Sequence, residues 1–175
     1  MSPSVRRILP SDGYALAHLR HEALRSEPHA FAMSVPQLAQ ANDESWTQLC
    51  RRTATGTDAL FVIARDDTLV GMVGCRVDSS DKMAHCGIIW GMFVAPSYTG
   101  RGYGAQLIHA VIAHGEHQQL RMLKLSVTVT QQRAIALYHR HGFHEYAQEP
   151  ALLYIDNQEI DALHMVYRYA YGGTQ

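Results

Sequence analysis

Near the middle of this chain, a predicted strand runs directly into alternating glycines. Residues 84–94 are rich in β-forming side chains, and the hexapeptide 100–105 reads Gly-Arg-Gly-Tyr-Gly-Ala. Apolar residues then recur at helical spacing up to about His117. Glycine permits backbone conformations closed to other residues, and the free N–H groups and positive dipole of a helix start attract anions. We therefore predict that this turn binds a phosphorylated ligand.

Length, charge and cysteine content restrict the class of protein. The 175 residues suffice for one domain with a buried core, which we expect to span residues 1–175. The formal net charge is -1 without a basic block, so no nucleic-acid partner is expected. Three widely spaced cysteines favour reduced thiols, and no run is apolar enough for a signal peptide or a membrane span. These features predict a cytoplasmic protein without a membrane partner.

The order of the predicted elements indicates an α+β fold. Strands are expected at 5–9, 60–65, 69–77, 84–94 and 122–129, with extended structure resuming at Phe143 and hairpin strands at 152–155 and 163–169. Helices are expected from about Asp12 to before Pro28, at 42–52, from the glycines to His117, and along the stripe of Ala134, Leu137, Tyr138 and His141 that Gly142 ends. Segment 28–40 is predicted to be a loop.

The glycines alone fit two classes of cofactor. Their spacing satisfies the dinucleotide fingerprint G-x-G-x-x-G/A, which also requires an acidic residue about twenty positions later to hold the ribose hydroxyls. No Asp or Glu occurs between His117 and His144, and the upstream strands lack βαβ crossovers. A dinucleotide-binding Rossmann fold is therefore disfavoured.

A second block, later in the chain, favours coenzyme A. Residues 134–138 read Ala-Ile-Ala-Leu-Tyr and are followed by Gly142 and Phe143. With the glycine turn, this chain resembles the GCN5-related N-acetyltransferase superfamily, whose motifs are Q/R-x-x-G-x-G/A after a strand ending V-x-P, and A-x-x-L-Y-x-x-x-G-F. The resemblance covers about residues 60–143, the expected donor-binding core. It implies an acyl-CoA N-acyltransferase-like fold, with a twisted, mixed and mostly antiparallel sheet flanked by about four helices.

The same resemblance implies acetyl-CoA as the donor and a primary amine, small or peptidic, as the acceptor. The amine is expected to attack directly in a ternary complex, without a metal, in a cleft where strands 84–94 and 122–129 splay apart. Residues 20–50 and the C-terminal hairpin are expected to grip the acceptor. The residues predicted to bind the donor are Met92, Phe93, Val94, Thr99, Gly100, Arg101, Gly102, Tyr103, Gly104, Ala105, Gln131 and Tyr138.

Most of these contacts are expected to come from the main chain. The strand residues would pair with the pantetheine amides like an added strand, and the amides of the glycine turn would hold the pyrophosphate. Two positions depart from the family pattern. Thr99 replaces a Gln or Arg, for which Arg101 can compensate as a charged donor, and Gln131 replaces an Asn.

Tyr138 is the predicted catalytic residue, because its context matches the family motif. A tyrosine hydroxyl aimed at the sulfur can protonate the departing coenzyme A thiolate. The base is less clear. Family members often place a Glu in the strand before the glycines, but residues 83–94 contain no Asp or Glu, and Ile88 lies near that position. Base candidates elsewhere are Glu22, His85, Glu149 and Asp161.

The missing carboxylate also bears on the substrate. Deprotonating a lysine-type amine at pH 7 costs about 4.6 kcal/mol, whereas an α-amine costs about 1.1 kcal/mol. The absence of a carboxylate from residues 83–94 therefore favours an acceptor amine of low pKa or a base elsewhere in the chain. It also leaves open a second interpretation, a non-catalytic acyl-CoA-binding or sensor domain of the same fold. Whether the protein forms a homodimer stays open as well.

The remaining histidines and cysteines suggest no further chemistry. The pairs His114/His117 and His139/His141 lack a third ligand at a suitable spacing, so we expect solvated side chains and no metal. Cys86 has no Cys-His signature around it and is expected to be a buried apolar thiol.

Overall fold

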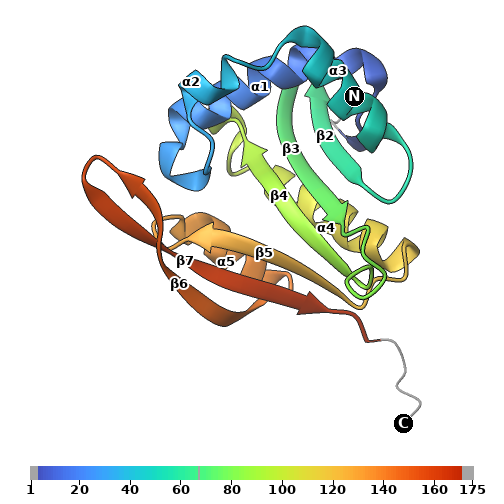
Figure 1. The fold of residues 1–175 in the computed structure, drawn as a ribbon. Helices are drawn as coiled ribbons and strands as arrows, with labels where there is room; N and C mark the ends of the chain where they lie inside the picture. Colours follow the sequence, from blue (N-terminus) through green and yellow to red (C-terminus); the bar gives the residue numbers. More distant parts are fainter. Residues whose placement is uncertain (1–3, 67, 171–175) are drawn as a thin grey trace.

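The protein is built on a twisted mixed sheet in a computed structural model that describes residues 4–66 and 68–170. Within these residues the sheet has seven strands in the order β1-β2-β3-β4-β5-β7-β6 (Figure 1). Neighbouring strands are antiparallel, except that β4 and β5 are parallel. The strands are β1 (Val5–Arg7), β2 (Ala59–Arg65), β3 (Thr68–Val77), β4 (Cys86–Val94), β5 (Met122–Thr128), β6 (His144–Ile155) and β7 (Gln158–Arg168).

Helices cover both faces of this sheet. The helices α1 (Gly13–Ser26), α2 (Val35–Leu38) and α3 (Asp43–Ala54) lie over one face of β2–β4, and α4 (Tyr103–His117) and α5 (Gln132–Arg140) lie on the other (Figure 1). Each layer buries its own apolar cluster. Leu16 and Leu19 of α1 belong to the first cluster, and Leu107 of α4 and Leu125 of β5 belong to the second. The predicted fold class is confirmed.

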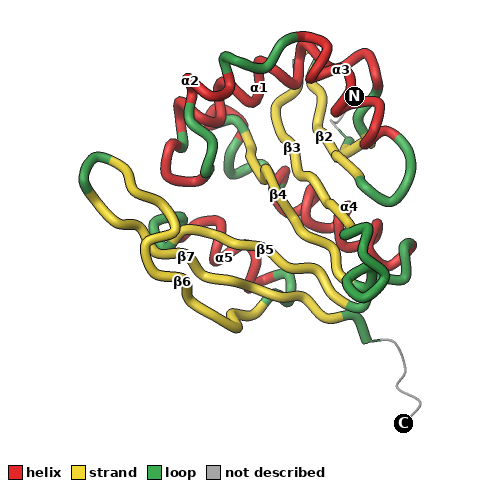
Figure 2. The backbone as a smooth tube through the Cα atoms, viewed as in Figure 1, coloured by secondary structure: helices red, strands yellow, loops and turns green. Residues whose placement is uncertain are grey.

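The parallel strands β4 and β5 separate soon after they meet. Their described pairing is confined to Cys86–Ile88 opposite Met122–Lys124. Further along, β4 contains one extra residue opposite β3, and Gly91 there has φ of 64°. A bulge of this kind bends a strand and increases its twist. Figure 2 shows the two strands diverging toward the left of the view, as the sequence predicted.

The prediction of a loop at 28–40 is wrong in part. The structure holds a 3₁₀ turn, η2 (Pro28–Ala30), and the single turn of α2. A capping box starts α2, because the backbone N–H of Ser34 donates to the side-chain oxygen of Gln37 at 2.9 Å and the Ser34 hydroxyl accepts from the Gln37 N–H. Pro36 is tolerated because it lies in the first turn. The sequence contains this capping box, but the helix that it starts is only four residues long.

The C-terminal hairpin is much longer than predicted. Strands were expected at 152–155 and 163–169, but β6 and β7 run through His144–Ile155 and Gln158–Arg168. Nine of the twelve residues of β6 are exposed and none is buried, so its sequence lacks the alternation of a half-buried strand. Its register also shifts twice, once between Glu145 and Ala147 and again between Glu149 and Leu153. Backbone pairing with β7, which no local pattern reveals, therefore defines this strand.

The expectation that His114 is solvated is also wrong. The side chain is buried, and its Nε2 lies 2.7 Å from the carbonyl oxygen of Thr57. Its ring meets the edge of Phe61 at a centroid distance of 5.7 Å. Leu107, Val111 and His114 follow one another at helical spacing on α4, so the apolar stripe itself indicated this burial. His114 is therefore a buried residue of the interface between α4 and the strand that carries Phe61.

Buried His114 is expected to make the fold sensitive to acid. Burial lowers its pKa below the ordinary value of 6.5, and the charges of Arg7 and His117 act in the same direction against the hydrogen bond to Thr57. The unfolded chain then binds more protons than the folded one just below pH 6.5, so this contribution to stability is present above pH 6.5 and lost as the pH falls. Urea unfolding at pH 7.5 and 5.5 should show a smaller acid loss for His114→Gln than for the wild type.

The matched control for this measurement is His18→Gln on α1, where the side chain is exposed and is not among the groups that act on His114. It should keep the wild-type difference in unfolding free energy between the two pH values. Equal acid losses in wild type, His114→Gln and His18→Gln would contradict the role given to His114.

Candidate active site

The turn between β4 and α4 depends on two glycines in left-handed conformation. Gly100 has φ of 74°, and Gly102, the N-cap of α4, has φ of 78°. A Cβ built on either residue would meet no atom within 4 Å, so conformation rather than space requires glycine here. The first N–H groups of α4 have no acceptor within the helix and point at this turn. The turn therefore presents main-chain N–H groups at the start of a helix, an arrangement that favours anions.

Two neighbouring side chains complete the turn without filling it. The Thr99 hydroxyl donates to the carbonyl of Pro96 at 2.9 Å, which ties it to the turn η3 (Pro96–Tyr98). Arg101 is exposed, with its guanidinium carbon 5.2 Å from the centre of the Tyr98 ring. Thr99 thus stabilises the loop, while Arg101 presents its charge beside the loop.

A cleft of about 460 Å³ extends from this turn along β4 to α5. The predicted donor-binding residues that line it are Met92, Phe93, Val94, Thr99, Gly100, Gly102, Tyr103, Gly104, Ala105 and Gln131. Tyr103 and Phe93 line the cleft although both are largely buried. Residues far apart in the sequence are thereby brought to one surface.

Two arginines of this cleft were not predicted. Arg133 and Arg140 of α5 line it together with Leu137. These positions are spaced i, i+4 and i+7, so they share a face of the helix. The family motif drew attention to Leu137, and the arginines on either side of it could have been found by the same spacing. They add positive charge across the cleft from the glycine turn.

A narrower cavity of about 80 Å³ continues the cleft where β4 and β5 diverge. The two share Ala30, Phe31, Met92, Gln131 and Ala134. Tyr138 lines the narrow part and is otherwise buried, with its ring 5.8 Å from that of Phe143. Burial raises the pKa of Tyr138 well above its usual value, so the hydroxyl stays protonated at neutral pH. Tyr138 can therefore donate a proton at the inner end of the cleft.

This geometry accompanies a match in sequence. The model of the Acetyltransferase (GNAT) family matches residues 16–143. The chain belongs to this family. N-alpha-acetyltransferase 30 of Homo sapiens is 23% identical in an alignment of 150 residues that covers 81% of this chain but only 39% of the human protein. The chain thus spans about two-fifths of the length of that relative.

Solved structures show the same GNAT fold. An acetyltransferase of the family from Streptococcus pneumoniae superposes with a TM-score of 0.87 at 20% identity, covering 96% of this chain and 100% of that one. An acetyltransferase from Salmonella typhimurium, solved with its cofactor acetyl-CoA, superposes with a TM-score of 0.84 at 15% identity and covers all of both chains. At these identities the likeness establishes the fold alone.

Three other observations bear on this GNAT chain. Among residues 4–66 and 68–170, no cluster of three or more His, Cys, Asp or Glu side chains is arranged to hold a metal ion. No helix in the described part of the chain is long and apolar enough to cross a membrane. Cys86 is buried, as the sequence indicated.

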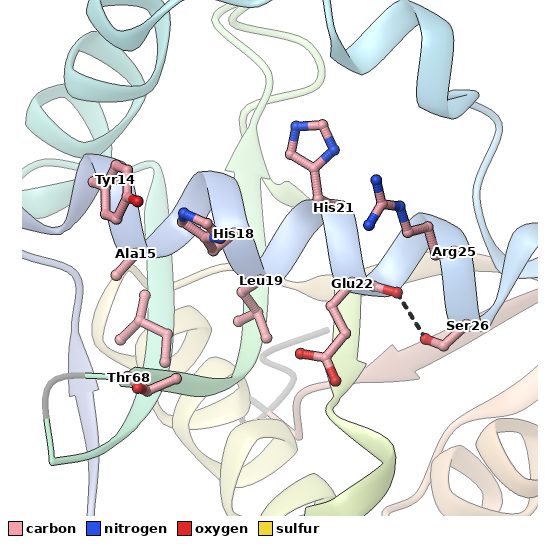
Figure 3. A pocket seen from close by; sticks show the side chains of 10 residues that line it. Tyr14, Ala15, His18, Leu19, His21, Glu22, Arg25, Ser26 and Thr68 are labelled. Atoms are coloured by element: carbon pink, nitrogen blue, oxygen red, sulfur yellow. Dashed lines mark hydrogen bonds between the residues drawn. The ribbon is translucent and has the colours of Figure 1, made fainter.

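The four base candidates lie in different places. Glu22 lines a separate groove of about 730 Å³ along α1, near His18, Arg25 and Thr68 (Figure 3). His85 is exposed before the start of β4, at the opposite end of that strand from Gly91. Neither residue lines the narrow cavity.

The other two candidates lie on the C-terminal hairpin. Asp161 accepts hydrogen bonds from the backbone N–H of Ala151 and the amide of Gln148, both at 2.9 Å, and the first of these contributes most to lowering its pKa. Both oxygens of the Asp161 carboxylate therefore accept hydrogen bonds from the irregular part of β6. Glu149 lies 2.7 Å from Nε2 of His164, a residue that sequence analysis did not select.

Proposed function

We propose that this chain transfers the acetyl group of acetyl-CoA to a primary amine by direct attack in a ternary complex. The observation that carries the proposal is a continuous cleft with an anion-binding turn at one end and the protonated Tyr138 hydroxyl at the other. The family membership and the cofactor of the Salmonella structure support the same donor.

The glycine turn and the arginines would hold the phosphates of the donor. The helix-start N–H groups accept an anion without a side chain, and Arg101, Arg133 and Arg140 add charged donors around the cleft. The Gln131 side-chain amide donates a hydrogen bond to Glu27 at 3.3 Å, and these two residues form part of the other wall of the cleft. Phosphate binding is thus expected to depend on the backbone first and on charge second.

The unpaired edge of β4 would hold the pantetheine arm. Beyond Ile88 the described residues of β4 have no strand partner on the β5 side, which leaves main-chain N–H and C=O groups facing the cleft. An extended ligand can pair with such an edge as an added strand. The thioester would then lie at the narrow cavity beside Tyr138.

In the transfer step, the amine nitrogen bonds to the acetyl carbon, the carbon–sulfur bond breaks, and the Tyr138 hydroxyl gives its proton to the sulfur. The charged amine loses one proton before it attacks and a second as the amide forms, and Tyr138 takes a proton back from solvent, so one proton is released overall. An α-amine is the expected acceptor, because it loses its proton at lower cost than a lysine side chain does. The human relative is named an N-alpha-acetyltransferase, which supports this preference.

The test is a binding assay joined to an amine screen. Acetyl-CoA should raise the melting temperature of the protein, whereas NAD should not. A panel of amino acids, peptide N-termini, polyamines and aminoglycosides should contain an amine that releases thiol from acetyl-CoA. Stabilisation by NAD alone would contradict the donor. Stabilisation by acetyl-CoA with no turnover on any amine would favour the sensor interpretation.

A further inference from the structure

A histidine–carboxylate pair lies next to the narrow cavity on the face opposite Tyr138. Ser126 of β5 lines that cavity and pairs directly with His164 of β7. Directly paired residues of antiparallel strands share a face, with their Cα atoms about 4.5 to 5.5 Å apart. His164 is therefore one strand away from the wall of the cavity.

The alternation of β5 places the two titratable groups on opposite sides of the sheet. Leu125 and Val127 point toward α5 and belong to the same cluster as Tyr138. Ser126 lies between them in sequence and is exposed, so it points to the other face. An acid on one side of the splayed strands and a base on the other fit a reaction in which one proton is taken and another given.

The contact with Glu149 sets the chemistry of this histidine. Nε2 of His164 lies 2.7 Å from a carboxylate oxygen of Glu149, and the side chains are 28% and 44% exposed. A carboxylate only accepts hydrogen bonds, so Nε2 carries the hydrogen and donates it. Nδ1 is then left with a lone pair, and the carboxylate stabilises the imidazolium that forms when Nδ1 takes a proton.

We propose that His164, positioned by Glu149, is the base that takes the proton from the acceptor amine. This inference rests on the proposed function. Nδ1 of His164 takes one proton from the charged amine, and the neutral nitrogen then bonds to the acetyl carbon while the carbon–sulfur bond breaks and Tyr138 protonates the sulfur. The second amine proton leaves to solvent as the amide forms, and Tyr138 takes a proton back from solvent. His164 later returns its proton to solvent. Glu149, one of the four base candidates, is thereby a positioning residue.

Other charged or titratable groups share the surroundings of His164 and enter its pH dependence. The Tyr146 ring lies 5.9 Å from the His164 ring, and the Lys124 ammonium lies 5.9 Å from the Tyr146 ring. By register and packing, the groups that face this region are Glu149, Tyr146 and His144 on β6, Lys124 on β5 and His29 on η2.

His164→Gln is expected to lower kcat about 10²-fold at pH 7, a typical effect of removing a general base. The loss should shrink to a few-fold near pH 10, where the amine is deprotonated without help. KM for acetyl-CoA should not change. Glu149→Gln should lower kcat about 10-fold and leave the same KM unchanged. Imidazole added to His164→Ala should restore part of the rate, which a purely structural role would not allow.

The chain offers a matched control on the opposite face. His139 and Glu145 form a pair 3.1 Å apart, with side chains 45% and 46% exposed. His139→Gln and Glu145→Gln should keep the wild-type rate. A His164→Gln rate equal to that of His139→Gln would overturn the proposal. If His164→Gln melts early, a wild-type kcat in Glu149→Gln together with no imidazole rescue would overturn it. A wild type that acetylates no amine would overturn the proposed function as well.

Discussion

Tyr138→Phe is expected to lower kcat for acetyl transfer about 10² to 10³-fold and to leave KM for acetyl-CoA nearly unchanged. Phenylalanine keeps the packing against Phe143 and removes only the hydroxyl that lines the narrow cavity. A tyrosine hydroxyl is protonated at neutral pH and burial raises its pKa further, so the substitution removes the proton for the departing sulfur. Steady-state thiol release with the best amine of the panel measures both constants.

Tyr14→Phe is the matched control, because it removes the same atom from a side chain that is 76% exposed on α1. Its kcat should equal that of the wild type, and both variants should keep the wild-type melting temperature within a few degrees. A full kcat in Tyr138→Phe would show that solvent or another group protonates the sulfur, and would remove Tyr138 from the mechanism.

Gly102→Val is expected to weaken acetyl-CoA binding at least 10-fold, or about 1.4 kcal/mol. The left-handed φ of 78° disfavours any side chain, and a branched one most. The space beyond Gly102 is empty and faces the cleft, so a valine would project to the place where the phosphates are expected. Isothermal titration calorimetry with acetyl-CoA measures the change.

Gly56→Val separates this effect from backbone strain. Gly56 follows α3, has φ of 88°, and likewise has no atom within 4 Å of a built Cβ, but it lines a different cavity from the donor cleft. Both variants should lose comparable stability, and only Gly102→Val should lose affinity. Equal affinities in the two variants would contradict the assignment of the turn to phosphate binding.

Local patterns predicted the central part of the fold. The strict alternation of residues 122–129 matches β5, and the apolar spacing after the glycines matches α4. Both signals are periodic and come from contacts with one continuous core, which is why they can be read without coordinates. The glycines of the turn could be selected for the same reason, since a left-handed backbone leaves few alternatives to glycine.

Features to which several distant segments contribute were predicted less well from local sequence patterns. The length of β6 depends on pairing with β7 and is hidden by exposed residues and two register shifts. The sequence does not show that Arg133 and Arg140 line the donor cleft, because this depends on the position of α5 across the cleft from the glycine turn. In the sequence, Glu149 is one of four base candidates, and only its contact with His164 in the structure distinguishes it from the others.

The amino-acid sequence by itself predicted the class of fold, the glycine turn and the tyrosine expected to give a proton. The glycine turn follows from local spacing, whereas the fold class and Tyr138 follow from the resemblance of two short motifs to the GNAT family. The tertiary structure decided which groups share the cleft. His164 is 26 residues from Tyr138 in sequence, and only the pairing of β7 with β5 brings it beside the cavity that Tyr138 lines. Strand register between distant segments is set by the whole packed sheet, and no local pattern encodes it.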